Sequence, residues 1–293
     1  MKFTTFHSSA SSKASGQQPR FGVVDGDSVI DLNAADPEVP ADMRLALKAG
    51  IDLAAAAKAA IASGAARLLL SSVELAPMVP EPGKVVCLGL NYFDHAKEGG
   101  REKPEYPWFF LRCASSLLAP NADALLPKVS ERFDYEAELA VIIGKTAKHL
   151  TQADALSCVF GYTCFNDMSV RDYQKKTPQW TIGKNFDATG GFGPVLVTAD
   201  ELPAGATDLR IQCRLNGEVM QDANTSDMIW GVAETISLLT ECMTLEPGDV
   251  IIMGTPAGVG QARKPPVFMK AGDSVEIEIE RIGVLRNRVV AQA

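Results

Sequence analysis

The 293-residue sequence has few histidines, no closely spaced cysteines and no long apolar run. With only His7, His95 and His149, a histidine-rich zinc site is nearly ruled out. Six cysteines are scattered without a C-x-x-C pair, which is typical of reduced thiols in a cytoplasmic protein. No apolar stretch reaches the roughly 18 residues of a membrane-spanning helix, and the polar N-terminus lacks the apolar core of a signal peptide. We therefore expect a cytoplasmic protein that has no membrane partner.

The chain also lacks an excess of positive charge. Its 36 acidic and 28 basic side chains give a formal net charge of −8. Polyanion binding usually needs a basic stripe, so a nucleic-acid partner is not expected. A small anionic substrate is not excluded, because the local field decides its binding.

The composition changes along the chain. Short apolar segments flank Asp25-Gly26, a pair typical of a tight turn between two strands. The alanine-rich stretch 42–70 favours helix. We therefore expect residues 1–75 to form a small α+β N-terminal domain. Residues 76–293, which begin with a proline-rich stretch, are expected to form a second, larger domain.

The second domain is predicted to consist mainly of strands. Its strands outnumber its helices and rarely alternate with them one for one, which argues against a doubly wound parallel sheet. The prediction is a mixed α/β, β-rich fold.

Two glutamates stand out in the predicted strand 133–143. Side chains two apart on a strand share a face, so Glu136 and Glu138 point the same way. Adjacent carboxylates repel each other and lose solvation when they are buried, unless a cation lies between them. The pair is therefore a candidate metal site. The alternative is an exposed strand face with spaced acids, as we expect for the strand at 274–280.

A second candidate group follows at 165–175. If a helix starts near Asn166 or Asp167, then Asp167, Arg171 and Gln174 lie on one face. Such a face could hold a metal and one end of an anionic ligand. The alternative, a helix cap followed by an ion pair, is the commoner arrangement.

A third group combines a histidine with a glutamate. His95 and Glu98 are three residues apart in a predicted helix at 93–98, where the carboxylate could orient the imidazole as a general base. The alternative is a solvated helix with a surface histidine.

Two further segments could contact a ligand. Lys184 could bind an oxyanion or a carboxylate. The glycines in the segment 254–260 allow close approach to a ligand, although a tight turn explains them equally well.

Seven segments in this order resemble blocks of the fumarylacetoacetate hydrolase family, over about Lys84 to Val290. They are GLNYFDHAKE, DYEAELAVIIG, GYTCFNDMSVRDYQ, QWTIGKNFD, GFGP, LNGEVMQ and GTPAGVG. The resemblance implies a mixed β-sandwich roll, a homodimer and a small-molecule 2-oxo acid substrate.

The resemblance also implies roles for individual residues. Mg²⁺ or Mn²⁺ would be held by Glu136, Glu138 and Asp167, an all-oxygen set that suits a hard cation. His95 and Glu98 would form the catalytic dyad. The implied roles of the others are catalysis for Lys184 and substrate binding for Arg171, Gln174 and Thr255.

Arg112 departs from the family pattern, because many members carry lysine at this place. An additional guanidinium suggests a second anionic group, so we expect Arg112 to bind a dicarboxylate such as fumaryl- or maleylpyruvate. The alternative is a buried ion pair with an acid such as Glu105 or Asp134.

The implied reaction is hydrolysis of the C–C bond of an acylpyruvate or another 2,4-dioxo acid. The alternative is a decarboxylase or isomerase of aromatic catabolism that acts on hydroxymuconate-type diacids or on oxaloacetate. A non-catalytic binding protein is less favoured, because every acid of the metal set and both residues of the dyad are present.

Overall fold

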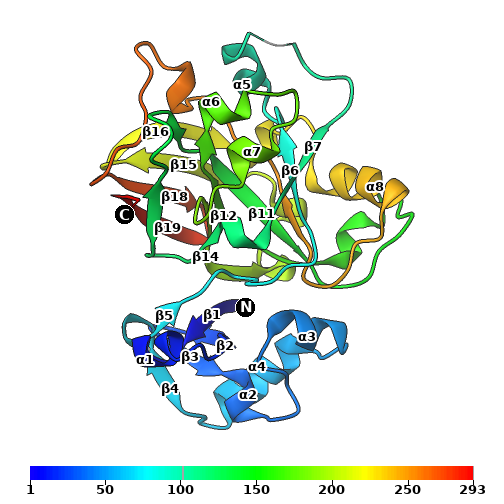
Figure 1. The fold of residues 1–293 in the computed structure, drawn as a ribbon. Coiled ribbons are helices and arrows are strands. Elements are labelled where there is room, and N and C mark those ends of the chain that lie inside the picture. The colour runs from blue at the N-terminus through cyan, green and yellow to red at the C-terminus, as the bar shows by residue number, and fades with distance from the viewer. Residues whose placement is uncertain (101, 293) are drawn as a thin grey trace.

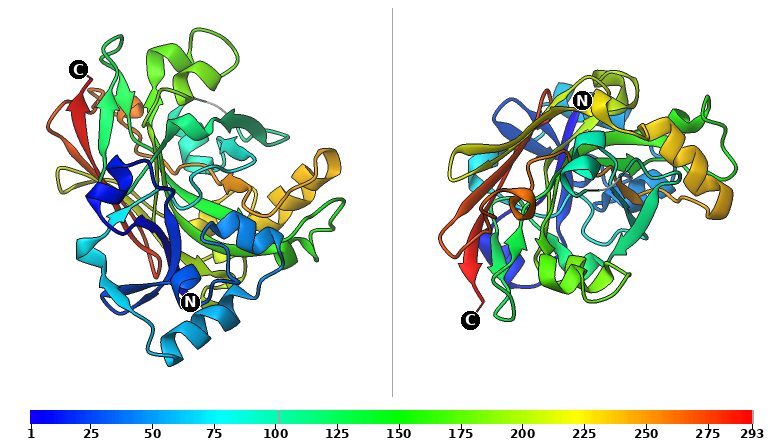
Figure 2. Two further views of the ribbon diagram at one scale, coloured as in Figure 1. Left: turned by 60° about the horizontal axis from the view of Figure 1, so that its bottom comes forward. Right: turned by 90° about the horizontal axis from the view of Figure 1, so that it is seen from above.

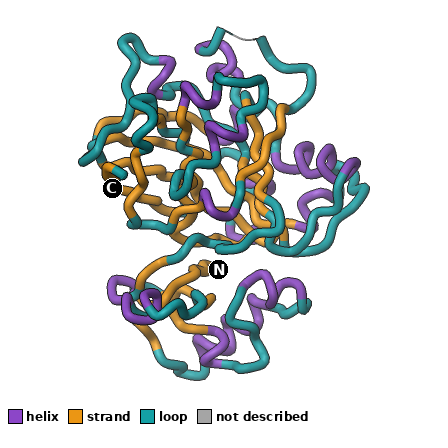
Figure 3. Tube along the Cα trace, in the orientation of Figure 1, coloured by secondary structure: helices purple, strands orange, loops and turns teal. Residues whose placement is uncertain are grey.

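The computed structural model describes residues 1–100 and 102–292, and its architecture is rich in β-structure (Figures 1 and 3). A large mixed sheet packs against a five-stranded sheet, and there is also a short two-stranded sheet. The predicted β-sandwich architecture is confirmed.

The N-terminal part of the chain, blue in Figure 1, lies below the rest in that view. Its elements are β1 (Lys2–His7), α1 (Ala10–Ala14), β2 (Arg20–Asp25), β3 (Ser28–Asp31), α2 (Leu32–Ala35), α3 (Met43–Lys48), α4 (Leu53–Ala62), β4 (Arg67–Leu69) and β5 (Glu74–Leu75). The hairpin expected at Asp25-Gly26 is present, since Asp25 pairs with Ser28.

The large sheet continues through the rest of the chain in the order β4-β3-β2-β1-β14-β12-β11-β17-β6-β7, with β5 on β1 and β8 on β14. Its further strands are β6 (Val85–Gly89), β7 (Trp108–Arg112), β8 (Leu117–Leu118), β11 (Ala137–Ile143), β12 (Val159–Asp167), β14 (Gly190–Thr198) and β17 (Val250–Ile252). The N-terminal strands therefore extend the same sheet, because β1 pairs with β14 at Phe3 and Leu196. The boundary at residue 75 stays a prediction.

The five-stranded sheet has the order β16-β15-β18-β19-β9. Its strands are β9 (Asp123–Leu126), β15 (Arg210–Leu215), β16 (Glu218–Asn224), β18 (Ser274–Ile279) and β19 (Gly283–Ala291). Alternate residues of β18 are buried, as the sequence VEIEI predicts. Ile277 and Leu285 of this sheet share a core with Leu139 and Val141 of β11, so the main core lies between the sheets.

Strand β11 is buried along its whole length because both of its faces are covered. Leu139 and Val141 face the core between the sheets. Ala140 and Ile142 belong to a second core, which includes Phe3 and packs on the opposite face. Glu136 and Glu138 continue the row of Ala140 and Ile142, so the strand's alternation places them on this second face.

The remaining elements are short, apart from α8 at the side of the molecule opposite β19 (Figure 2). They are α5 (Phe93–Glu98), β10 (Phe133–Asp134), β13 (Ser169–Val170), α6 (Arg171–Gln174), α7 (Thr181–Lys184) and α8 (Val232–Cys242). The helix expected at 93–98 is confirmed. Among the described residues, no helix is long and apolar enough to cross a membrane.

No helix starts near Asn166 or Asp167, so the condition for one helical face carrying Asp167, Arg171 and Gln174 is not met. Strand β12 instead runs to Asp167, because Asn166 and Asp167 pair with Gly191 and Gly190 of β14. Helix α6 begins only at Arg171. Asp167 and Arg171 therefore come from different elements, and sheet pairing rather than helix periodicity positions the aspartate.

Candidate active site

Nine of the ten residues that the sequence predicts for the site line one cavity of about 260 Å³. They are His95, Glu98, Glu136, Glu138, Asp167, Arg171, Gln174, Lys184 and Thr255. Leu88, Phe110 and Trp180 contribute an apolar part of the lining.

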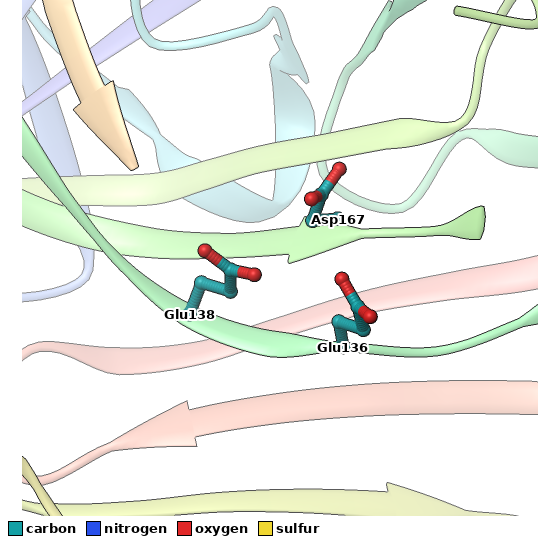
Figure 4. A group of neighbouring side chains, drawn as sticks. All are labelled: Glu136, Glu138 and Asp167. Atoms are coloured by element: carbon teal, nitrogen blue, oxygen red, sulfur yellow. The ribbon is translucent and has the colours of Figure 1, made fainter. Parts of the chain in front are cut away.

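Three carboxylates meet at this cavity because of the register between β11 and β12 (Figure 4). Ala137 pairs with Asn166, so Glu136 and Asp167 are neighbours, and the Asp167 N–H donates to the Glu136 carbonyl at 3.0 Å. One ligand oxygen from each of Glu136, Glu138 and Asp167 lies within 4.8 Å of the others. We call these residues the acidic triad. All three are buried.

Lys184 and Arg171 compensate part of the negative charge of the triad. The Lys184 Nζ lies 2.5 Å from Glu136 Oε2 and 2.6 Å from Asp167 Oδ2, and Arg171 Nη1 lies 2.8 Å from Glu136 Oε1. Burial by itself would raise the pKa of Glu136, but Lys184 and Arg171 lower this pKa to about 2. Burial would lower the pKa of Lys184, but Asp167 and Glu136 raise it, so the ammonium stays charged.

Glu138 is the least compensated member of the triad. Its Oε2 accepts a 2.6 Å hydrogen bond from the Gly254 N–H. Burial, together with the nearby charges of Asp167 and Glu136, raises its pKa well above the usual value of a glutamate. A divalent cation would remove this repulsion.

The donor set fits Mg²⁺ or Mn²⁺. Each triad residue offers a carboxylate oxygen, and hard cations prefer oxygen ligands. The carboxylate oxygens that accept hydrogen bonds from Lys184 and Arg171 keep further lone pairs for coordination. The geometry therefore accommodates the cation that the family resemblance implies.

Lys184 reaches the triad because two short helices pack very closely. A Cβ on Gly183 would lie 2.4 Å from the backbone N of Gln174, so only glycine lets α7 approach α6 this closely. The approach buries Lys184 to 2% exposure and brings Gln174 to the cavity. Gln174 Oε1 in turn accepts a 3.0 Å hydrogen bond from Arg171 Nη1.

The two residues predicted to form the dyad are in contact on α5. His95 Nδ1 lies 2.7 Å from Glu98 Oε1, and Glu98 Oε2 accepts a 2.9 Å hydrogen bond from the Gly258 N–H. Because the carboxylate accepts at Nδ1, Nε2 is left as the basic nitrogen. Both side chains are partly exposed, 15% for His95 and 21% for Glu98, and both line the cavity.

Three buried polar residues hold this arrangement in place, and the sequence analysis missed their roles. Asp134 accepts from Arg171 Nε at 2.8 Å and from the Gly260 N–H. Gln221 accepts from the Ala137 N–H and donates to Thr255 Oγ1 at 2.8 Å, which ties the triad strand to the Thr255 loop. Asn91 donates to the carbonyl of Met253, just before that loop. Asp134, Gln221 and Asn91 all lie in the segments that resemble the family, which was the available signal.

Arg112 lies outside the cavity lining, contrary to the expectation that it contacts substrate. Its side chain is fully buried, and its Nε donates to Asp167 Oδ1 at 2.5 Å. Its Nη2 donates to the Met168 carbonyl at 2.7 Å. The alternative of a buried ion pair describes this geometry, with Asp167 as the partner in place of Glu105 or Asp134.

We expect Arg112→Lys to weaken metal binding about 10–100-fold, the usual effect of losing a hydrogen bond behind a metal ligand. Lysine keeps the charge but cannot bind Asp167 and Met168 together. Calorimetric titration with Mn²⁺ measures the effect. Arg112 acts through Asp167, so kcat/KM should fall equally for monocarboxylic and dicarboxylic substrates. A selective loss on dicarboxylic substrates would contradict this placement.

Comparison with known proteins identifies the family to which the chain belongs. A family model described as fumarylacetoacetate (FAA) hydrolase C-terminal matches residues 84–290. The chain belongs to this family.

Its relatives carry names for more than one reaction. The chain is 44% identical to the mitochondrial oxaloacetate tautomerase FAHD2A of Homo sapiens over 267 aligned residues. The alignment covers 90% of this chain and 85% of that protein. A fumarylacetoacetate hydrolase from Exiguobacterium antarcticum shares 35% identity with a TM-score of 0.83, over all of both chains. A maleylpyruvate hydrolase from Sphingobium sp. SYK-6, solved with manganese(II) ion and pyruvate, shares 32% identity with a TM-score of 0.81, also over all of both chains. Family membership therefore leaves the reaction open.

Proposed function

We propose that this protein is a Mg²⁺- or Mn²⁺-dependent enzyme that interconverts the enol and keto forms of a short 2-oxo acid of the oxaloacetate type. The observation that carries the proposal is the presence, in one cavity, of the acidic triad with Lys184 and of the His95–Glu98 pair. Enolisation needs one base and one site of positive charge, and the cavity offers both. The 44% identity to an oxaloacetate tautomerase supports the choice of substrate.

The chain's own residues would divide the work as follows. A divalent cation on the triad would supply positive charge beside the 2-oxo and carboxylate oxygens. His95 Nε2 removes a proton from C3, and the C–H electron pair forms the C2–C3 double bond while the carbonyl oxygen becomes negative. Lys184 donates a hydrogen bond to that oxygen. The oxygen takes a proton from water, and the hydroxide left behind takes the proton from His95. Arg171, Gln174 and Thr255 bind the substrate's polar groups.

A second candidate is the hydrolysis of an acylpyruvate, including fumaryl- or maleylpyruvate. The similarity to maleylpyruvate hydrolase favours it. In this reaction, His95 would take a proton from water, and the hydroxide would attack the 4-carbonyl. The C3–C4 bond then breaks, its electron pair forms the C2–C3 double bond of the pyruvate enolate, and the acyl part leaves as a carboxylic acid. His95 returns its proton to the enolate. The two reactions share the same polarised 2-oxo end of the substrate and differ in whether a C–C bond breaks.

The decisive experiment compares products on a panel of substrates. The metal-loaded protein is given enol-oxaloacetate, acetylpyruvate and maleylpyruvate, and the rate with metal alone is subtracted. Loss of the enol's ultraviolet absorbance without release of pyruvate or CO₂ supports tautomerisation. Pyruvate released together with a carboxylic acid identifies hydrolysis, and CO₂ release identifies decarboxylation. No turnover on any of these compounds would overturn the proposal.

The other expectations of the sequence analysis stay predictions. The homodimer can be tested by measuring the mass in solution, and the absence of nucleic-acid binding by titration with duplex DNA and with RNA. Cytoplasmic location is also untested, and the human relative is named as mitochondrial.

A further inference from the structure

The cavity has an aromatic part that the proposed chemistry does not use. Trp180 and Phe110 line it together with Leu88 and Leu90, while the triad and its cations form the polar part. Phe110 connects the two parts, because the Lys184 Nζ lies 5.2 Å from its ring centre. A substrate whose polar head is at the triad can place its remaining group along this aromatic lining.

Trp180 packs against strand β6 because Gly89, the last residue of that strand, has no side chain. In the register of β6 and β7, Gly89 pairs with Trp108 and Cys87 pairs with Phe110, so these residues share one face. A Cβ on Gly89 would lie only 2.1 Å from Cζ3 of Trp180. The indole therefore packs directly on the backbone of β6, in the space that any other residue would fill.

The neighbours of Trp180 fix its position relative to the acidic triad. Its ring centre lies 5.6 Å from that of Trp108 and 5.7 Å from that of Phe110. Trp180 also caps α7, four residues before Lys184, and residues four apart lie on the same side of a helix. The indole and the ammonium thus come from one short segment.

We infer that Trp180, seated on Gly89, is a specificity-determining residue that limits the size of the group on C3 of the 2-oxo acid. This inference rests on the proposed function, because it requires the 2-oxo acid head to bind at the triad. A short substituent leaves the indole in place. A large acyl or aryl group would have to displace the indole from its contacts with Trp108 and Phe110.

Binding measurements can separate this inference from the proposed reaction. Pyruvate and phenylpyruvate have the same 2-oxo acid head and differ only in the group on C3. Calorimetric titration of the Mn²⁺-loaded protein gives the ratio of their two dissociation constants. We expect Trp180→Ala to tighten phenylpyruvate binding about tenfold or more relative to pyruvate, within the range that pocket size commonly contributes to discrimination. Trp180→Phe should give an intermediate ratio.

The matched control is Tyr106→Ala, which removes an exposed aromatic side chain near β7 that lies outside the cavity lining. It should leave the ratio unchanged. An unchanged ratio in both Trp180 variants, or equal weakening of both ligands, would overturn the inference and leave Trp180 as a support for Lys184. If pyruvate does not bind the metal-loaded wild type, the proposed function fails instead.

Discussion

Replacing Glu138 by glutamine is expected to abolish binding of Mg²⁺ or Mn²⁺, and with it activity, while the metal-free protein stays folded. Among the described residues, Glu138 is the triad member whose carboxylate forms no ion pair with a lysine or an arginine. Its negative charge is therefore the one most available to bind a divalent cation. Glutamine has nearly the same shape and can still accept the hydrogen bond from Gly254. The loss of metal affinity should exceed the roughly 10–100-fold effect of changing a residue behind a ligand.

Titration calorimetry and thermal unfolding together measure this effect. Ligand at 100 times its dissociation constant stabilises a folded protein by about 2.7 kcal/mol, so Mn²⁺ should raise the Tm of the wild type and not that of Glu138→Gln. The matched control is Glu218→Gln at the exposed start of β16, which should respond to Mn²⁺ like the wild type. Full metal binding by Glu138→Gln would refute the assignment of the triad.

The part of the site that the sequence predicts best depends on local periodicity. Alternation along a strand is enough to place Glu136 and Glu138 on one face, and a spacing of three on a helix is enough to join His95 to Glu98. The strands expected in the second domain follow from apolar runs for the same reason. These relations involve neighbours in the chain, so no knowledge of the tertiary fold is needed.

The parts of the fold and the site that local patterns in the sequence do not reveal depend on contacts between distant segments. Asp167 enters the triad through its register with β11 and β14, which no pattern within residues 165–175 reveals. Arg112 is the last residue of the edge strand β7, and its sequence neighbours do not reveal that it is buried against Asp167, 55 positions away. The N-terminal strands likewise join the large sheet through β14, a pairing that spans most of the chain.

Buried polar residues were the hardest to recognise, because their types are common in loops and turns. Gln221 lies on β16 of the smaller sheet and connects the Ala137 backbone to Thr255 only after the two sheets have packed. Asp134 similarly gains its role from Arg171 and the Gly260 N–H. Such residues carry no charge pattern or spacing of their own, so their function becomes visible only in the folded structure.

Replacing His95 by alanine is expected to lower kcat by roughly 10²–10⁴, the usual contribution of one positioned base. Metal affinity should barely change, because His95 does not belong to the triad. Steady-state kinetics on the true substrate, with Mn²⁺ titration alongside, measures both quantities. His7→Ala, in β1 and outside the cavity lining, is the matched control. Wild-type kcat in His95→Ala would mean that another group is the base.

Glu98→Gln tests whether Glu98 sets the position of the proton on His95, because glutamine keeps nearly the same shape as glutamate. The Gly258 N–H donates to Glu98 Oε2, so a glutamine there would present its oxygen to Gly258 and its NH₂ group to His95 Nδ1. Nδ1 would then have to accept, which moves the imidazole proton to Nε2 and removes the base from the cavity side. The same reversal of the tautomer lowers kcat about 10⁴-fold in a serine protease triad. We therefore expect Glu98→Gln to lower kcat nearly as much as His95→Ala, with KM and metal affinity little changed. If Glu98→Gln kept most of the wild-type kcat, Glu98 would serve to hold α5 in place and would not determine which nitrogen of His95 carries the proton.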